Sequence, residues 1–380
     1  KQSEPMKGSC LLFEYLQELI DSSAFSVLAR ETGYRVLLAG ASAFVFSIIF
    51  GRWFISWVGS RKLVEQTAKG DSECLDDLHD HKANTPTMGG VIFIVAAGVA
   101  TLLWAKLDSR PIMMLLAYTL GFGAIGLADD LIKLGPGKRN GLRGKTKLFF
   151  QLLLGISAGC ILYWDPLVVH HAGAVDPATA LSVPFFKDAS FSIGLFYIPL
   201  VALVLAGSSN AVNLTDGLDG LAAGISVLTG ATFVVVALLV GSEQASGLFR
   251  IAHVEGGAET AVFTAALVGG CLGFLWFNCH PAKIFMGDVG SLSLGGALGL
   301  VAVLCKQELL MVLVGGVLVA ETVSVFLQVT SFKLTGRRIF RCTPLHHHFE
   351  FKGWSEARVT LSFWVASALL ALASVVSLRL

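Results

Sequence analysis

The sequence predicts an all-α polytopic integral membrane protein of about ten transmembrane helices, with both termini extracytoplasmic. Of its 380 residues, 54% are hydrophobic and only 14% are charged, whereas soluble proteins carry about 25% charged residues. Apolar segments of about 20 residues, enough to cross ~30 Å of hydrocarbon, recur along the chain. Lys and Arg are concentrated in alternate loops between these segments. The composition therefore places the chain in the bilayer, and the distribution of Lys and Arg among the loops indicates its orientation.

Ten apolar segments are each predicted to form one membrane-spanning helix. Small residues recur in them at spacings that let helices pack closely, as at Gly269 and Gly273. The predicted spans are 34–58, 86–107, 111–128, 146–164, 191–212, 217–240, 258–278, 288–305, 308–332 and 357–378.

An even number of spans places both termini on the same side of the membrane. More than half of the 28 Lys and Arg residues lie in the alternate loops 59–85, 129–146, 213–216, 279–287 and 333–356. Because positively charged loops face the cytoplasm, we expect these loops to be inside and the termini outside. The net charge of +1 argues against a nucleic-acid partner.

Residues 1–33 precede the first span and form a separate N-terminal segment. Lys1–Pro5, ahead of Met6, is interpreted as an expression scar. Leu11–Arg30 contains acidic residues that interrupt it too often for a signal peptide. We expect this stretch to form an amphipathic helix at the membrane surface, and residues 34–380 to form one ten-helix transmembrane domain.

Five aspartates lie at the ends of predicted spans on the cytoplasmic face. Asp129 and Asp130 follow the third span, Asp216 and Asp219 separate the fifth and sixth, and Asp288 begins the eighth. Helix ends are ordinary places for a capping Asp, but charge near hydrocarbon is expensive and indicates function. Five at one face favour a shared anionic or metal site.

The spacing of these aspartates suggests which of them act together and which have different roles. If their segment is helical, Asp216 and Asp219 share a face. The adjacent Asp129 and Asp130 would point about 100° apart, which predicts two separate roles. Asp288 follows Gly287 at a helix start, where its carboxylate can hold a cation.

Basic and polar residues in the same region predict further contacts. Lys133 lies at i+4 from Asp129 and i+3 from Asp130, so it can pair with either carboxylate or with a phosphate. Thr343 as N-cap, with Pro344 at the first helical position, predicts a short helix carrying the three consecutive histidines from His346. Oxygen-rich aspartates favour Mg²⁺ or Mn²⁺ over zinc, which makes these histidines phosphate or nucleotide donors rather than metal ligands.

A polar stripe runs along the predicted ninth span. Glu321 lies near its middle, with Ser324 and Gln328 on the same helical face. It indicates either a water-accessible groove or a buried partner.

Two classes of function fit these features. A transporter would place carboxylates near the bilayer centre, with broken helices and an internal repeat. An enzyme acting at the cytoplasmic surface on a phosphorylated substrate and a lipid would gather acids, Lys, Asn and His at one face. The one-sided distribution favours the enzyme.

Six sequence motifs, in order along the chain, resemble the phospho-N-acetylmuramoyl-pentapeptide transferase branch of the polyprenyl-phosphate sugar-1-phosphate transferase superfamily. The triple histidine narrows the resemblance to that branch. The motifs are T-P-T-M-G-G (85–90), A-D-D (128–130), N-A-V-N-L-T-D-G-L-D-G-L-A (210–222), F-L-W-F-N (274–278), F-M-G-D-V-G-S (285–291) and P-L-H-H-H-F-E (344–350).

The resemblance implies a magnesium-dependent enzyme, with Mn²⁺ as a possible substitute, in the bacterial cytoplasmic (inner) membrane. It implies transfer of phospho-N-acetylmuramoyl-pentapeptide from its UDP derivative to undecaprenyl phosphate, releasing UMP and forming lipid I, the first membrane intermediate of peptidoglycan. The active site would lie in the cytoplasmic loops. A homodimer is also implied.

The resemblance also assigns roles to residues. Asp288 would bind the metal, and Asp129 and Asp130 would position or deprotonate the lipid phosphate, with His346 as a further catalytic residue. Phe285 would offer a ring on which uracil stacks. The nucleotide side would comprise Asn213, Asp216, Gly217, Asp219, Asn278 and Phe285. The residues that contact the phosphates and the sugar would be Lys82, Thr87 and Lys133, and those that close the site would be Gln328, His346 and His347.

Two mechanisms fit these residues. Direct attack by the lipid phosphate is favoured, because that group is largely anionic at pH 7 and needs positioning more than deprotonation. The alternative is a two-step reaction through a phosphoryl-enzyme intermediate on Asp288 or Asp129.

Overall fold

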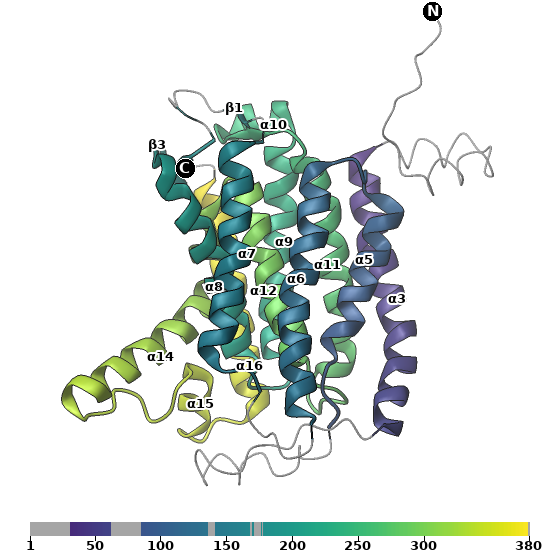
Figure 1. The fold of residues 1–380 in the computed structure, drawn as a ribbon, viewed down its shortest axis with the longest axis vertical. Coiled ribbons are helices and arrows are strands. Elements are labelled where there is room, and N and C mark those ends of the chain that lie inside the picture. Colours follow the sequence, from purple (N-terminus) through teal and green to yellow (C-terminus); the bar gives the residue numbers. More distant parts are fainter. Residues whose placement is uncertain are drawn as a thin grey trace, which may run out of the picture.

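The computed structural model describes residues 31–61, 85–135, 141–167, 169–170, 176 and 178–378, and its long helices form one bundle (Figure 1). Within these residues, nine helices are long and apolar enough to cross a membrane, and a tenth apolar helix, α5, is shorter. These ten are α3 (Thr32–Ser60), α5 (Gly90–Trp104), α6 (Arg110–Lys133), α7 (Gly144–Trp164), α8 (Tyr197–Thr215), α9 (Leu221–Val240), α11 (Gly257–Asn278), α12 (Gly287–Leu304), α14 (Gly316–Thr335) and α16 (Glu356–Ser377). The all-α polytopic fold class is confirmed, while the count of ten spans and the side of the termini stay predictions.

Helix α12 forms the centre of the bundle. Of its most apolar window, 94% is buried inside the protein, against 17% for α16 and 28% for α3 at the periphery. α12 packs between α6 and α8, and α11 packs against α3, α5 and α9. The high glycine content of α12 allows this close approach of neighbouring helices.

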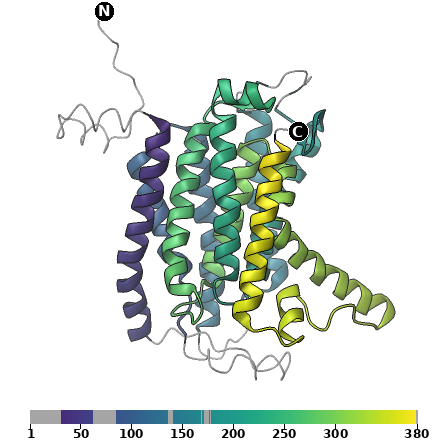
Figure 2. The same ribbon diagram turned by 180° about the vertical axis from the view of Figure 1, so that it is seen from behind.

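The predicted ninth span is interrupted rather than continuous. Residues 308–332 form a short helix, α13 (Glu308–Val314), then a break at Gly315, then α14. Glycine pairs favour such breaks because they are poor helix formers, and Gly315 and Gly316 are adjacent here. Beyond the break, α14 inclines away from the other helices (Figures 1 and 2).

Helix α3 begins and α16 ends at the same end of the bundle, here called the terminal end (Figure 1). This end carries the helix α10 (Glu243–Phe249), the 3-10 turn η2 (Gly194–Phe196) and four short strands. β1 (Val169–His170) pairs with β4 (His253–Val254), and β2 (Ala180–Val183) forms a hairpin with β3 (Phe186–Ser192). The predicted fifth span therefore starts later than residue 191, since β3 and η2 precede α8.

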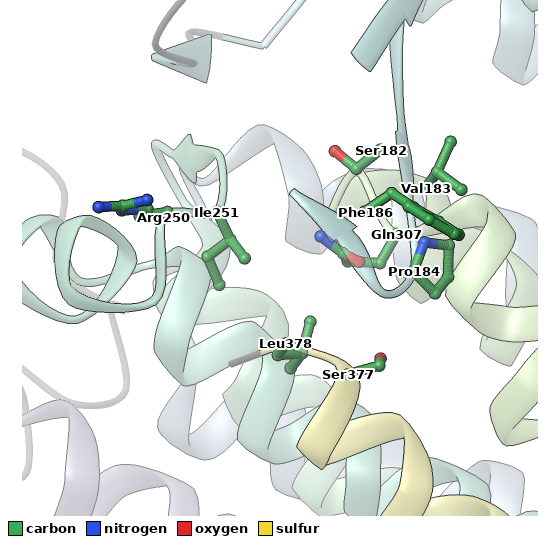
Figure 3. A pocket seen from close by; sticks show the side chains of 9 residues that line it. All are labelled: Ser182, Val183, Pro184, Phe186, Arg250, Ile251, Gln307, Ser377 and Leu378. Carbon is green, nitrogen blue, oxygen red and sulfur yellow. The ribbon is translucent and has the colours of Figure 1, made fainter. Parts of the chain in front are cut away.

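A small pocket lies at the terminal end, between the β2–β3 hairpin, the segment after α10 and the end of α16 (Figure 3). Its lining residues are Ser182, Val183, Pro184, Phe186, Arg250, Ile251, Gln307, Ser377 and Leu378. The predicted aspartates lie at the opposite end, here called the site end, where α6 finishes and α12 starts (Figure 1). Residues 1–30, which hold the predicted scar and most of the amphipathic segment, lie outside the described residues, as does Lys82.

Candidate active site

Three aspartates meet at the site end. Asp129 and Asp130 lie in the last turn of α6, and Asp288 lies in the first turn of α12, more than 150 residues later. All three are buried, and one carboxylate oxygen from each lies within 4.8 Å of the others. The structure thus brings together three of the four residues that were predicted to be catalytic; the fourth, His346, is not part of this cluster.

Two glycines allow this close approach. A methyl group at Gly126 on α6 would lie 2.1 Å from the carbonyl oxygen of Asp288. Gly287, with φ +72°, occupies the left-handed region, and a methyl group there would lie 2.7 Å from Asp130 Oδ2. Any side chain at either position would separate α6 from α12.

Asp130 caps the start of α12. Its two oxygens accept hydrogen bonds from the backbone N–H groups of Asp288 and Val289, each at 3.0 Å. A carboxylate at a helix N-terminus satisfies free donors and complements the helix dipole. Asp130 therefore positions Asp288, whereas Asp129 faces two lysines, so the adjacent carboxylates have different surroundings.

Two lysines lie between the carboxylates. Lys133 Nζ lies 3.0 Å from Asp129 Oδ2 and 3.4 Å from Asp288 Oδ1. Lys147, near the start of α7, lies 3.0 Å from Asp129 Oδ2 and also pairs with Asp288 Oδ2. Leu142 N–H donates to Asp129 Oδ1 at 2.6 Å. The buried negative charge is therefore compensated from two helices.

Lys147 was not among the predicted residues. It lies within the predicted span 146–164, in the first turns of α7. A charged residue inside an apolar span is the signal that singled out the aspartates, and the same criterion applied to cations would have found Lys147. Apart from Lys133, the basic residues of the loop 129–146 had been interpreted only as signals of the orientation of the chain in the membrane.

The carboxylate cluster fits a divalent metal ion. Hard cations such as Mg²⁺ and Mn²⁺ prefer oxygen ligands, and Mg²⁺ in particular is usually held by one or two carboxylates together with substrate phosphates. Asp129, Asp130 and Asp288 supply only oxygen donors at one point. Both carboxylate oxygens of Asp130 already accept backbone N–H groups, so Asp288 and Asp129 are better placed than Asp130 to bind the metal ion.

Asn213, in the last turn of α8, connects that helix to Asp288. Its side-chain amide donates to Asp288 Oδ1 at 3.0 Å and to Ser291 Oγ at 2.9 Å. Asp216 follows α8, and the chain turns at Gly217 before α9 begins. Asp216 and Asp219 were expected to share a face only if their segment is helical, and that condition is not met, because α8 ends at Thr215 and both residues lie in the turn before α9.

Asp219 and Asn278 hold the loops together at the site end. Asp219 Oδ2 accepts the N–H of Ala282 at 3.0 Å and lies 3.2 Å from His280 Nδ1. Asn278 accepts the N–H of Gly220 at 3.1 Å and donates to the carbonyl of Ile284 at 2.9 Å. These two predicted nucleotide contacts are thus fixed in place by the turns after α8 and α11.

Thr87 and Phe285 lie on two chain segments that run together beside the carboxylates. The N–H of Phe285 donates to Pro86 O, and Gly89 N–H donates to Phe285 O, both at 2.8 Å. Thr87 is buried, and its hydroxyl has no hydrogen-bond partner among the described residues. A buried hydroxyl without a partner is unusual and suits a ligand contact.

The histidine helix α15 (Leu345–Glu350) lies below α14 and α16 at the site end (Figure 1). It begins after Pro344, which precedes the helix instead of occupying its first position, so Thr343 is not its N-cap. His346 is 1% exposed and lies 3.2 Å from Glu321 Oε1, measured from Nδ1. His347 pairs with Glu350 at 2.7 Å. Glu321 therefore has the buried partner that its sequence position suggested.

Gln328 and His348 brace the loop between α14 and α15. The Gln328 side chain accepts the N–H groups of Ile339 and Phe340 and donates to Phe340 O. Burial, together with nearby Lys352 and Arg341, lowers the pKa of His348. The Nδ1 atom of His348 accepts the N–H of Arg341 at 3.1 Å.

An apolar groove of about 350 Å³ lies between α8 and the broken α13–α14 segment. Two of its lining residues, Leu203 and Val323, are exposed on the outside of the bundle, and α14, which lines one side of it, diverges from the other helices (Figure 1). Its lining includes Leu200, Leu203, Val204, Ala211, Met311, Leu318, Val319 and Val323. Such a lining suits a hydrocarbon chain.

Comparison with known proteins gives consistent matches over most of the chain. Residues 112–306 match the model of glycosyl transferase family 4, and residues 82–94 match phospho-N-acetylmuramoyl-pentapeptide-transferase signature 1. The chain is similar to proteins of that name from three bacteria. It is 46% identical to that of Solidesulfovibrio magneticus over 94% of this chain and 96% of the relative, and 42% identical to that of Leptospira biflexa over 91% and 93%. It is also 42% identical to that of Thermodesulfovibrio yellowstonii over 97% of this chain and 100% of the relative.

The matched region contains the carboxylate cluster, since 112–306 includes Asp129, Asp130 and Asp288, and the signature includes Thr87. The similarity thus extends over the helices that build the site and over almost the full length of the relatives. The chain belongs to the phospho-N-acetylmuramoyl-pentapeptide-transferase family.

Proposed function

We propose that this chain transfers phospho-N-acetylmuramoyl-pentapeptide from its UDP derivative to undecaprenyl phosphate, releasing UMP and forming lipid I. The observation that carries this proposal is the cluster of three buried carboxylates and two half-buried lysines in a chain of this family. Joining a phosphate to a diphosphate brings several negative charges together, so the site must supply cations and hold both substrates in line. The loop charges support a site end that faces the cytoplasm, and the bacterial relatives support a location in the inner membrane.

Mg²⁺, or Mn²⁺ in its place, would be held by Asp288 with Asp129, and when bound it would neutralise phosphate oxygens in the transition state. Asp130 would fix Asp288 through the start of α12. Lys133 and Lys147, which contact the carboxylates here, would turn to phosphate oxygens when substrate enters. Asn213, Asp216, Gly217, Asp219, Asn278 and Phe285 would form the nucleotide side, with Thr87, Lys82, Gln328, His346 and His347 around the phosphates and sugar.

Direct attack by the lipid phosphate is the mechanism that these contacts favour. Asp129 is held by two lysines and by Leu142 N–H, and Asp288 is held by the same two lysines and by the side-chain amide of Asn213. Carboxylates engaged in this way are poor nucleophiles but good positioning groups. The phosphorus–oxygen bond to UMP would break as the bond to the lipid phosphate forms, and UMP would leave with the electron pair.

The apolar groove beside α14 would hold part of the polyprenyl chain. It is lined by α8, α13 and α14, and α8 leads directly to Asn213 near the carboxylates. A lipid lying in it would present its phosphate at the site end. The homodimer implied by the family resemblance stays a prediction.

A substrate comparison tests the proposed function. Purified protein in detergent or nanodiscs is expected to release UMP from UDP-N-acetylmuramoyl-pentapeptide when undecaprenyl phosphate and Mg²⁺ are present. UDP-N-acetylglucosamine serves as the matched control and should give no lipid product. Turnover of the acetylglucosamine derivative alone would contradict the proposed substrate while leaving the phosphotransferase chemistry intact.

Replacing Lys147 with Gln should lower turnover and tighten metal binding. Removing an ammonium group from Asp129 and Asp288 removes a competitor for a divalent cation, but it also removes a partner for phosphate. We expect kcat to fall by about ten- to a hundredfold and the Mg²⁺ concentration for half-maximal activity to fall. UMP release measured across a Mg²⁺ series checks both changes.

The matched control is Lys145→Gln, two residues earlier and exposed. It should leave both parameters at their wild-type values. Equal Mg²⁺ requirements for wild type and Lys147→Gln would show that Lys147 does not compete with the metal.

A further inference from the structure

Glu321 is a buried acid in an otherwise apolar helix. It lies in the second turn of α14 and is fully buried, although α14 as a whole is among the more exposed helices. Burial of a carboxylate at membrane depth is unfavourable unless a partner compensates it. A carboxylate in this position therefore needs a specific partner.

That partner comes from the histidine helix α15. Glu321 Oε1 accepts the backbone N–H of His346 at 3.2 Å and lies 3.2 Å from its Nδ1. Both side chains are at most 1% exposed. The neighbouring His347 has its own acid within α15, Glu350. His346 is thus contacted by an acid from another helix.

The other nitrogen of His346 faces the loop after α8. A methyl group built on Gly217 would lie 2.4 Å from His346 Nε2, so the imidazole is in contact with the Gly217 backbone. Both ring nitrogens of His346 are buried and have no hydrogen-bond partner among the described residues, so Nδ1 lies close to Glu321 Oε1 without a hydrogen bond to it; Glu321 Oε2 likewise has no partner there. Buried polar atoms are almost always paired, so a nitrogen aimed at this loop without a partner points to one that the substrate supplies.

We propose that Glu321 is a positioning residue that holds His346 so that its Nε2 faces a polar group of the nucleotide substrate at Gly217. An acid beside Nδ1 fixes which imidazole nitrogen is directed to the ligand, as carboxylates do for metal-bound and catalytic histidines. Gly217 leaves the space for the ring. The inference rests on the proposed function, because it takes the loop at Gly217 as the nucleotide side.

The experiment is a double-mutant cycle on the full chain in nanodiscs, with Glu321→Gln, His346→Asn and the double variant. Steady-state kinetics with varied sugar nucleotide give kcat and KM, and titration with UMP gives nucleotide affinity without turnover. We expect each single variant to lose about tenfold or more in kcat/KM. The double variant should lose no more than His346→Asn alone, because Glu321 acts through His346.

Two further variants separate positioning from a structural role. Glu321→Asp keeps the charge and should recover part of the loss seen with Gln, and it replaces Gln in the cycle if Glu321→Gln does not fold. Glu259→Gln makes the same chemical change in a buried glutamate that pairs with Arg35 in the first turns of α3 and α11, at the terminal end. It should lower the unfolding temperature while leaving kcat and KM unchanged.

Additive losses in the cycle, or wild-type kinetics and UMP affinity in Glu321→Gln, would overturn the proposal. A failure of the proposed function would appear in the substrate preference of the wild-type protein and not in the mutant cycle. A wild-type protein that prefers another sugar nucleotide contradicts the proposed substrate, and the cycle run with that nucleotide still decides whether Glu321 and His346 are coupled.

Discussion

Asp288→Asn should abolish metal-dependent UMP release while the protein stays folded. The change keeps the shape of the side chain and removes one negative charge from the point where three carboxylates meet. An amide binds Mg²⁺ poorly and leaves the charge of Lys133 and Lys147 less compensated. We expect kcat to fall at least about a hundredfold, equivalent to about 2.7 kcal/mol of transition-state stabilisation. UMP release across a Mg²⁺ series, together with the unfolding temperature, measures the effect.

The control for this variant is Asp108→Asn, an exposed aspartate just before α6 at the terminal end. It removes the same charge far from the site and should leave turnover unchanged. Retained Mg²⁺-dependent turnover in Asp288→Asn would remove Asp288 from the metal site. A cooperative unfolding transition near that of wild type is needed to interpret either result.

Gly126→Ala should be nearly as damaging, although Gly126 carries no functional group. Its methyl group would lie 2.1 Å from the carbonyl oxygen of Asp288, and a backbone atom in the core of the bundle cannot move aside alone. α12 would have to shift, which would break the hydrogen bonds from Asp288 and Val289 to Asp130. Overpacking costs typically 1–3 kcal/mol of stability, and a displacement of about 1 Å at a reacting group costs about a hundredfold in rate.

Gly123→Ala, one turn earlier on α6, is the matched control. A methyl group there would lie 3.6 Å from Ser293 Cβ, an ordinary contact. Because alanine favours a helix by about 1 kcal/mol over glycine, this variant should be as stable as wild type or slightly more so. Thermal unfolding and UMP release of both variants test the distinction. Equal behaviour of the two would mean that the α6–α12 approach does not limit the reaction.

Hydropathy was sufficient to predict the helices, because each span must satisfy its backbone hydrogen bonds within itself. The α14 break at Gly315 and the turn at Gly217 were not predicted, since glycine also occurs within packed membrane helices. The spacing of glycines in the sequence does not distinguish a glycine that ends or breaks a helix from one that lies within a packed helix. What distinguishes them is the neighbouring backbone, which only the folded chain provides.

The aspartates of the site were found from the cost of charge near hydrocarbon, and the structure brings Asp129, Asp130 and Asp288 together. The different surroundings of Asp129 and Asp130 could be predicted in part from their adjacency in the sequence, because neighbouring residues on a helix point in different directions. The capping of α12 by Asp130 was not predictable, because it depends on how two distant helices meet. Lys147 escaped notice because a single cation at a span end is also a normal topological signal.

The divergence of α14 also bears on how the lipid reaches the site. The groove beside it is lined by α8, α13 and α14 and includes residues exposed on the side of the bundle, such as Leu203 and Val323, so an isoprenoid can enter by diffusion within the plane of the bilayer, without leaving it. The rate should then follow the mole fraction of the lipid in the membrane rather than its concentration in the whole sample. Diluting the carrier lipid with inert phospholipid would slow the enzyme even when the amount of each reactant in the tube is unchanged.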